Sequence, residues 1–302
     1  MNFRFVIEYI AAWLVLKTLG LLPRPMARSC AGVLLRIVYS FTPRLRSVAA
    51  RNLELALPGL SLRERHEMIH GVYRSLARLL ADFSHFSALT PQNASELVAF
   101  DGLENYDAAL AKGRGVLFLT AHIGAWELGA FAHGLKGYRL NVVYRALDNP
   151  ALNALVNHYR CLGGNPLIEK RESARGILAA LARNETVGIL ADQNTLADEG
   201  VFVNFFGVPA CATAGIARIA LHSGAEVVPA FCVWDAKAKR FHILYEPALV
   251  FSTTGDTERD VQAATQQMAD VIERVVRAYP DQWLWIHRRW KTRPPGQPLL
   301  YS

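Results

Sequence analysis

The stretch GVLFLTAHIGAWELGAF, residues 115–131, decides the fold class because its pattern changes in the middle. Its first six residues are apolar and rich in strand-forming side chains, which predicts a buried strand. The second half is typical of a helix, and Gly124 suits the turn between the two. The segment therefore predicts a strand that passes directly into a helix, the start of a βαβ unit.

Three further runs downstream have the same β-rich texture, with candidate helices between most of them. They are NVVYR at 141–145, TVGILAD at 186–192 and EVVPAFCVW at 226–234. Strands that alternate with helices indicate parallel pairing, since each crossover returns the chain to the same edge of the sheet. We therefore expect an α/β fold with a mostly parallel central sheet flanked by helices.

The chain before this region is predicted to be helical. Ser61 and Glu64 have the spacing of a capping box, which predicts a helix from Leu62 toward Phe86. A last helix is expected over 258–279, before Pro280. The predicted organisation is a membrane anchor helix at 1–22, a helical region packed on the core at 23–96, and an α/β core at 97–302 that ends in a basic and aromatic tail.

The anchor is predicted from the apolar run FVIEYIAAWLVLKTLGLL, residues 5–22. As a helix these residues would measure about 27 Å, slightly less than the hydrocarbon core of a bilayer. Six arginines and no acidic residue lie from Arg24 through Arg51, and this bias predicts that the rest of the chain stays on the cytoplasmic side of the membrane. The alternative is a buried N-terminal helix of a soluble domain.

The composition narrows the class of partner without choosing one. The 302 residues are 52% hydrophobic and carry a formal net charge of +7. This excess of positive charge favours an anionic partner: nucleic acid, an acidic membrane surface or a phosphorylated substrate.

Two residues of the opening stretch are candidates for chemistry. His122 follows the predicted strand and Glu127 lies in the predicted helix, at the sheet edge where α/β proteins place their sites. Residues five apart on a helix diverge, so their side chains can meet only if His122 lies in the turn before it. Glu127 would then accept a hydrogen bond from the imidazole and leave its other nitrogen as a general base. The alternative is a turn histidine and a surface carboxylate.

The wider pattern resembles a known family. The segment AHIGAWELG is similar to the H-x4-D/E box of glycerolipid acyltransferases, and the sequence around it looks like the bacterial lipid A late-acyltransferase family. The resemblance extends over VVYRALDNPALNALVNHYR at 142–160, ADQN at 191–194, FVNFFGVPACATAGIARIALHSGAEVVPAF at 202–231 and WLWIHRRWKTRP at 283–294. It covers nearly the whole chain.

The resemblance implies an inner-membrane enzyme that transfers a fatty acyl chain from acyl carrier protein or coenzyme A to a hydroxyl of a lipid A precursor. His122 would be the base and Glu127 its orienting partner. Arg160 and Asp192 match two further polar positions on which activity in the family depends. The planar guanidinium of Arg160 is expected to grip a phosphate or carboxylate, and Arg145 is a weaker candidate for contact with phosphate. Neither a cofactor nor a metal is expected, although HEMIH at 66–70 has the spacing of a zinc motif without a convincing third ligand.

The C-terminal tail adds a last expectation. Its cations interleave with three tryptophans, Trp283, Trp285 and Trp290, a texture that suits a lipid headgroup interface. The cations are His287, Arg288, Arg289, Lys291 and Arg293.

Two alternatives for the function of the chain remain open. One is an enzyme of the same family that acts on another glycolipid, such as a phosphatidylinositol mannoside, or on an aminolipid. The other is a non-catalytic protein that binds a membrane surface or nucleic acid.

Overall fold

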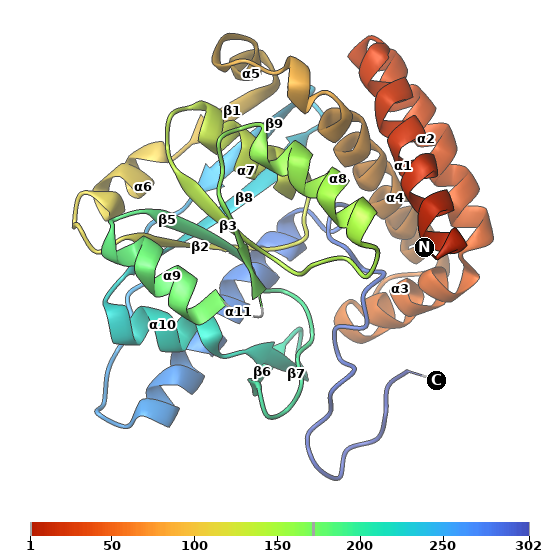
Figure 1. Ribbon diagram of the computed structural model, residues 1–302. Helices are drawn as coiled ribbons and strands as arrows, with labels where there is room; N and C mark the ends of the chain where they lie inside the picture. Colours follow the sequence, from red (N-terminus) through yellow and green to blue (C-terminus); the bar gives the residue numbers. More distant parts are fainter. Residues whose placement is uncertain (1, 171–172, 302) are drawn as a thin grey trace.

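The computed structural model describes residues 2–170 and 173–301 (Figure 1). Within these residues the main sheet has seven strands in the order β1-β9-β8-β2-β5-β3-β4. The strands are β1 (Val98–Asp101), β2 (Val116–Thr120), β3 (Leu140–Tyr144), β4 (Leu167–Glu169), β5 (Thr186–Leu190), β8 (Glu226–Asp235) and β9 (Arg240–Tyr245). Every neighbouring pair is parallel except β8 with β9. The prediction of a mostly parallel α/β sheet is confirmed.

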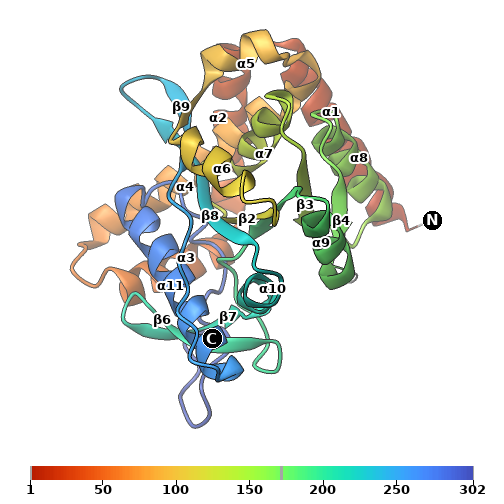
Figure 2. The same ribbon diagram turned by 90° about the vertical axis from the view of Figure 1, so that its left-hand side faces the viewer.

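Helices cover both faces of this sheet. Figure 2 shows α6 (Leu103–Leu110) and α7 (Trp126–Leu135) on one side of the strands, and α10 (Gly215–Ser223) and α11 (Thr257–Ala278) on the other. The faces follow from the alternation of side chains along a strand. Leu117 and Leu119 of β2 join the core beneath α10 and α11, whereas Phe118 joins the core beneath α7.

The helical N-terminal region consists of α2 (Arg24–Phe41), α3 (Pro43–Ala56), α4 (Leu62–Ser84) and α5 (Pro91–Leu97). The capping box at Ser61 and Glu64 is confirmed, because the Ser61 hydroxyl accepts from the Glu64 backbone and the Glu64 carboxylate accepts from the Ser61 backbone. The predicted C-terminal helix is also confirmed as α11.

The N-terminal helix α1 (Phe3–Leu21) lies along α4 and along α8 (Pro150–Cys161). Leu16 and Leu19 are buried there, and the Asn149 amide at the start of α8 donates to the carbonyl of Phe5 at 2.8 Å and to Glu8 at 3.1 Å. Among the helices of residues 2–170 and 173–301, none combines the length and the apolar character needed to cross a membrane.

The remaining described elements are the short helices η1 (Phe86–Ala88) and α9 (Ser173–Ala182) and an antiparallel hairpin of β6 (Gly200–Phe205) and β7 (Val208–Thr213). The sequence did not predict the hairpin. It packs against α11 and against the C-terminal segment after Pro280.

The expectation that the tail forms a lipid interface is wrong for its tryptophans. Trp283, Trp285 and Trp290 are at most 1% exposed, and Arg289 is 2% exposed. Arg289 donates to the carbonyl of Cys211 at 2.7 Å, so its charge is solvated by backbone oxygen inside the protein. The three indoles contribute a large apolar area to the core, and this burial explains the aromatic pattern of the tail without a membrane.

Candidate active site

The loop between β2 and α7 places His122 at the carboxyl edge of the sheet. The helix begins only at Trp126, so His122 lies before it, as the spacing argument required. Gly124 makes this turn with a φ of +59°, and a Cβ there would lie 2.1 Å from the carbonyl oxygen of Cys232. Only glycine fits this left-handed and crowded position.

The neighbouring strand β5 brings Asp192 to the same place. β2 and β5 are parallel with Thr120 opposite Leu190, so His122 and Asp192 both lie two residues beyond a pair in register. His122 Nδ1 lies 2.8 Å from Asp192 Oδ1, and the His122 backbone N–H donates to Oδ2 at 2.9 Å. Asp192 therefore fixes both the backbone and the ring of the histidine.

A third donor reaches Asp192 from the C-terminal segment. The indole Nε1 of Trp283 donates to Oδ2 at 2.7 Å, and the Asp192 side chain is only 2% exposed. The carboxylate is thus held by three hydrogen bonds in a buried setting, an arrangement that keeps it charged and immobile.

The prediction that Glu127 accepts a hydrogen bond from His122 is wrong: His122 is bound to Asp192 and Glu127 to Arg160. Glu127 lies in the first turn of α7, and its carboxylate is paired with Arg160, whose Nε reaches the two oxygens at 3.2 and 3.0 Å. Arg160 comes from the last turn of α8. The guanidinium outcompetes an imidazole for this carboxylate because it offers parallel donors and a full charge.

Electrostatics of the pair favour a charged imidazole. Burial opposes the charged form of His122, but the adjacent Asp192 carboxylate outweighs it, and the pKa of His122 is raised. Burial likewise opposes ionisation of Asp192, yet its bonds to His122 and Trp283 lower the pKa of that carboxyl. Asp192 therefore accepts from Nδ1–H, and Nε2 is the nitrogen left for chemistry.

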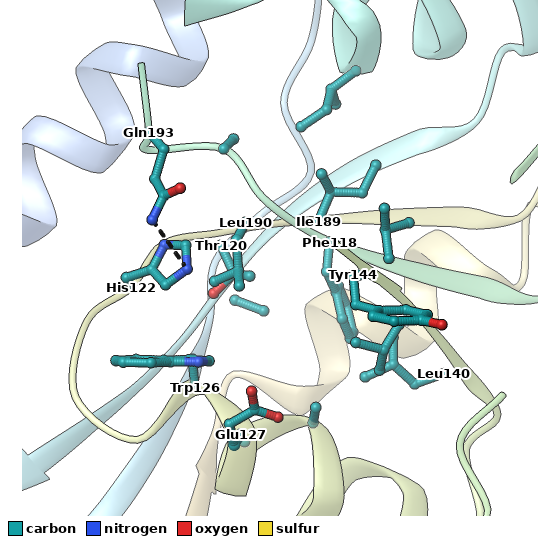
Figure 3. A pocket seen from close by; sticks show the side chains of 18 of the residues that line it. Phe118, Thr120, His122, Trp126, Glu127, Leu140, Tyr144, Ile189, Leu190 and Gln193 are labelled. Carbon is teal, nitrogen blue, oxygen red and sulfur yellow. Dashed lines mark hydrogen bonds between the residues drawn. The ribbon is translucent and has the colours of Figure 1, made fainter. Parts of the chain in front are cut away.

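The free side of His122 faces a cavity of about 380 Å³ (Figure 3). Gln193 lies on one side of the ring, its amide nitrogen 3.5 Å from Nε2, and Trp126 lies on the other. The cavity walls are mainly aliphatic and aromatic. Glu127, Arg145 and Arg160 also line it, so four of the five predicted residues border one space, and the fifth, Asp192, is hydrogen-bonded to His122.

Arg145 lies at the rim of this cavity. Its side chain is 75% exposed and pairs with Asp148 at 3.1 Å. An exposed arginine in this position can exchange a weak surface partner for a ligand anion at little cost.

Two contributors to the site, Trp283 and Gln193, were missed as site residues from the sequence. Gln193 follows Asp192 directly in the ADQN segment, so the signal for it was present. Trp283 lies 91 residues beyond its partner, and no local pattern links the two.

Comparison with known proteins supplies the family. A model of the bacterial lipid A biosynthesis acyltransferases matches residues 2–292. The chain is 28% identical over 298 residues to the lipid A biosynthesis lauroyltransferase of Escherichia coli strain K12, covering 97% of this chain and 95% of that protein.

Two further relatives are acyltransferases with other names. The lipid A biosynthesis myristoyltransferase of the same strain is 24% identical over 257 residues, which are 85% of this chain and 78% of the relative. The phosphatidylinositol mannoside acyltransferase of Mycobacterium tuberculosis strain H37Rv is 29% identical over 192 residues, 63% of this chain and 58% of the relative. The family model matches almost the whole length of this chain, and His122 lines an apolar cavity. This chain therefore belongs to the bacterial lipid A biosynthesis acyltransferase family.

Proposed function

We propose that this protein transfers a fatty acyl chain from a thioester donor to a hydroxyl of a lipid A precursor, with His122 as general base and Asp192 as its orienting partner. One observation carries the proposal: Nδ1 of His122 is bound to a buried carboxylate, while its ring lines an apolar cavity. An imidazole with one nitrogen held by a carboxylate, and the other free beside an apolar cavity that can take an acyl chain, suits acyl transfer.

In this chemistry Nε2 of His122 takes the proton from the acceptor hydroxyl, and the hydroxyl oxygen attacks the carbonyl carbon of the thioester. The tetrahedral intermediate then collapses, the carbon–sulfur bond breaks, and the thiolate receives the proton from the imidazolium. Asp192 stabilises the imidazolium between these steps. No covalent acyl-enzyme is required, because a thiolate is a good leaving group.

Glu127 and Arg160 have a different role in this proposal. Their ion pair lies at the cavity wall, with side chains 14% and 19% exposed, and each shifts the pKa of His122 in the opposite sense to the other. The Nε edge of Arg160 is occupied by Glu127, so it is poorly placed to grip a phosphate as first expected. We assign the pair a positioning role that shapes the cavity wall beside the base.

The substrates are proposed from charge and from the relatives. The names of the Escherichia coli relatives specify lipid A biosynthesis, and the net charge of +7 suits a phosphorylated glycolipid. Arg145, an exposed cation that lines the cavity, is proposed to contact an acceptor phosphate. The donor is proposed to be acyl carrier protein or a coenzyme A thioester.

The location is proposed to be the cytoplasmic side of the inner membrane, with attachment through the N-terminal helices. One face of α1 exposes Phe3, Ile7, Ile10 and Leu14, at helical spacing. One face of α2 exposes Met26, Val33, Ile37 and Phe41 in the same manner. Arg36 and Arg44, which are exposed in this region, supply charge for anionic lipid headgroups.

Purified protein in detergent tests the proposed reaction. It is given dodecanoyl-acyl carrier protein or dodecanoyl-coenzyme A with a lipid A precursor, a phosphatidylinositol mannoside or an aminolipid, and products are read by mass spectrometry. We expect one added acyl chain on the lipid A precursor, and loss of this product in His122→Ala by 10²-fold or more. Transfer within about threefold of wild type in His122→Ala would overturn the mechanism. Transfer only to another acceptor would overturn the substrate.

A further inference from the structure

The histidine motif HEMIH, residues 66–70, has no part in the proposed reaction. His66 and His70 lie on α4, and neither lines the cavity beside His122. In the described parts of the chain, no group of three or more His, Cys, Asp or Glu side chains could hold a metal ion. The two histidines instead contact Tyr39 of α2, so the role of the motif depends on the neighbours of this ring.

Tyr39 brings the motif and an arginine together around one aromatic ring. Its hydroxyl lies 3.3 Å from Nε2 of His66, and its ring stacks on that of His70 with the centroids 4.3 Å apart. The guanidinium of Arg46, from α3, lies over the same ring at 4.7 Å from its centroid. Because the ring already holds this guanidinium, the arginine loses little further freedom when it binds a ligand.

Two more arginines lie near His70. Burial lowers the pKa of His70, and so does the positive charge of its neighbours, which are His66, Arg74, Arg36 and Arg46. None of the three guanidinium groups has an ion pair or a hydrogen bond to any residue that the structure describes. The six side chains are here called the Tyr39 cluster: Arg36, Tyr39, Arg46, His66, His70 and Arg74.

The carboxylates that could neutralise the Tyr39 cluster are engaged elsewhere. The helices α2, α3 and α4 carry four acidic residues in all. Each has another partner: Glu54 binds Arg51, Glu64 caps the start of α4, Glu67 binds Arg63, and Asp82 binds Arg28. Arginines that gather without a counter-ion repel one another, and an anion that joins them relieves this repulsion. The cluster therefore has the composition of an anion site.

An exposed apolar surface adjoins this cluster. Ile37 follows Arg36 on α2 and Phe41 lies one turn further on, and the two are 51% and 81% exposed. Leu45, next to Arg46 on α3, is also exposed. The corner where α2 passes into α3 lies at the outer edge of the molecule (Figure 1). Arginines beside exposed apolar side chains suit a phosphate that carries hydrocarbon chains better than they suit a free ion.

We propose that the Tyr39 cluster binds the phosphate of an anionic membrane phospholipid, at a site separate from the active site. The arginines hold the phosphate oxygens by charge-assisted hydrogen bonds, and Ile37 and Phe41 contact the lipid chains. The inference rests on the proposed attachment through α1 and α2 and adds a defined headgroup site to it. No side chain of the cluster lines the cavity beside His122, so this lipid is not a substrate. It fixes how the protein sits on the bilayer.

Vesicle binding by the purified protein tests the site without turnover. One set of vesicles contains phosphatidylglycerol in phosphatidylcholine. The other contains oleate in the same phosphatidylcholine, at equal surface charge, so that its anion is a carboxylate. A phosphate site predicts binding to the first set at least about fivefold tighter than to the second. Equal affinity for the two sets would show that charge alone attracts the protein, and would overturn the proposal.

Substitutions that conserve charge separate a defined site from general attraction. Arg46→Lys with Arg74→Lys loses two planar guanidinium groups, and binding to phosphatidylglycerol vesicles should weaken about tenfold, the equivalent of one charge-assisted hydrogen bond. The matched control, Arg44→Lys with Arg63→Lys, changes two exposed arginines outside the Tyr39 cluster and should bind as wild type does. Equal binding by the two double variants would overturn the site.

Further arms of the same experiment identify the ligand. Glycerol phosphate that binds as tightly as the vesicles would make the ligand a free phosphate compound and the lipid assignment wrong. A carrier protein that binds wild type but not Arg46→Lys with Arg74→Lys, while vesicles bind both alike, would assign the cluster to a protein partner. Loss of acyl transfer in detergent by this variant would make the site part of acceptor binding and overturn the proposal.

Failure of the site and failure of the proposed attachment give different results. Wild-type protein that binds no vesicle would overturn both. Wild-type protein that binds phosphatidylglycerol vesicles, with the affinity unchanged in Arg46→Lys with Arg74→Lys, would overturn the headgroup site and leave the attachment through α1 and α2 standing.

Discussion

The carboxylate of Asp192 holds His122 at two points, through Nδ1 at 2.8 Å and through the backbone N–H at 2.9 Å. The second bond fixes the loop and the first fixes the ring, so the imidazole has little freedom to turn away from the cavity. The two residues come from neighbouring parallel strands whose ends are in register. The sheet itself therefore builds the pair.

Asp192→Asn should change the pH dependence of transfer as well as its rate. The carboxylate raises the pKa of His122, and a general base must be neutral, so wild-type activity should rise as the pH passes this raised pKa. Removing the charge lowers the pKa, and the acidic limb of the kcat profile should move to lower pH. The amide also favours the wrong tautomer, so kcat should fall by about 10²- to 10⁴-fold. An unmoved acidic limb would show that Asp192 does not act on His122.

Glu127 and Arg160 should behave as one unit in stability. Glu127→Gln leaves the mostly buried guanidinium without its ion pair and should reduce the free energy of unfolding by about 1–3 kcal/mol. Arg160→Lys loses the bidentate geometry and should cost a similar amount. Chemical denaturation of the two single variants and the double variant measures the coupling. A double variant whose loss equals the sum of the two single losses would contradict a direct pair.

Trp283 should support activity through Asp192 alone. Trp283→Phe keeps an aromatic ring in the core but removes the 2.7 Å bond to Oδ2, so kcat should fall several-fold while KM is retained. Trp290→Phe is the matched control, since Trp290 is equally buried and its indole donates to the carbonyl of Val208 instead. Steady-state kinetics at several pH values compare the two. Equal losses in both variants would reduce the role of Trp283 to packing.

Membrane attachment should depend on the exposed face of α1 and α2. Replacing Ile7 and Ile37, which are 52% and 51% exposed, with glutamine should strongly reduce flotation with vesicles of anionic phospholipid. Transfer in detergent should be retained, because neither residue lines the cavity. Val250→Gln changes an exposed apolar side chain elsewhere and should float as wild type does. Undiminished flotation of the double variant would exclude this face.

The sequence predicted those features that depend on neighbouring residues. The capping box at Ser61, the strand from Val116 and the turn at Gly124 each have their signal within a few positions, and the structure confirms them. The partner of His122 could not be predicted in this way. It depends on β5 pairing with β2, a contact across 70 residues, whereas the expected partner Glu127 was close in sequence.

Burial of the C-terminal tail could not be predicted from the sequence either. Alternating tryptophans and arginines look the same in a lipid interface and in a core where carbonyls accept from Arg289. Only the hairpin of β6 and β7, which supplies the Cys211 carbonyl and packs Phe205 against Trp283 and Trp290, distinguishes the two. The hairpin is a tertiary feature that the local pattern did not reveal.

The most direct test of the account is a double-mutant cycle that asks which carboxylate acts through His122. The rates of His122→Ala, Asp192→Asn and Glu127→Gln, and of the two double variants that contain His122→Ala, are measured on purified enzyme with a carrier-protein donor and a lipid A precursor. If Asp192 works only through the imidazole, His122→Ala with Asp192→Asn should be scarcely slower than His122→Ala alone, because groups that act as one unit are strongly non-additive. Adding Glu127→Gln should slow His122→Ala further. Fully additive losses for Asp192, with non-additive losses for Glu127, would contradict the central claim and restore Glu127 as the partner of the base.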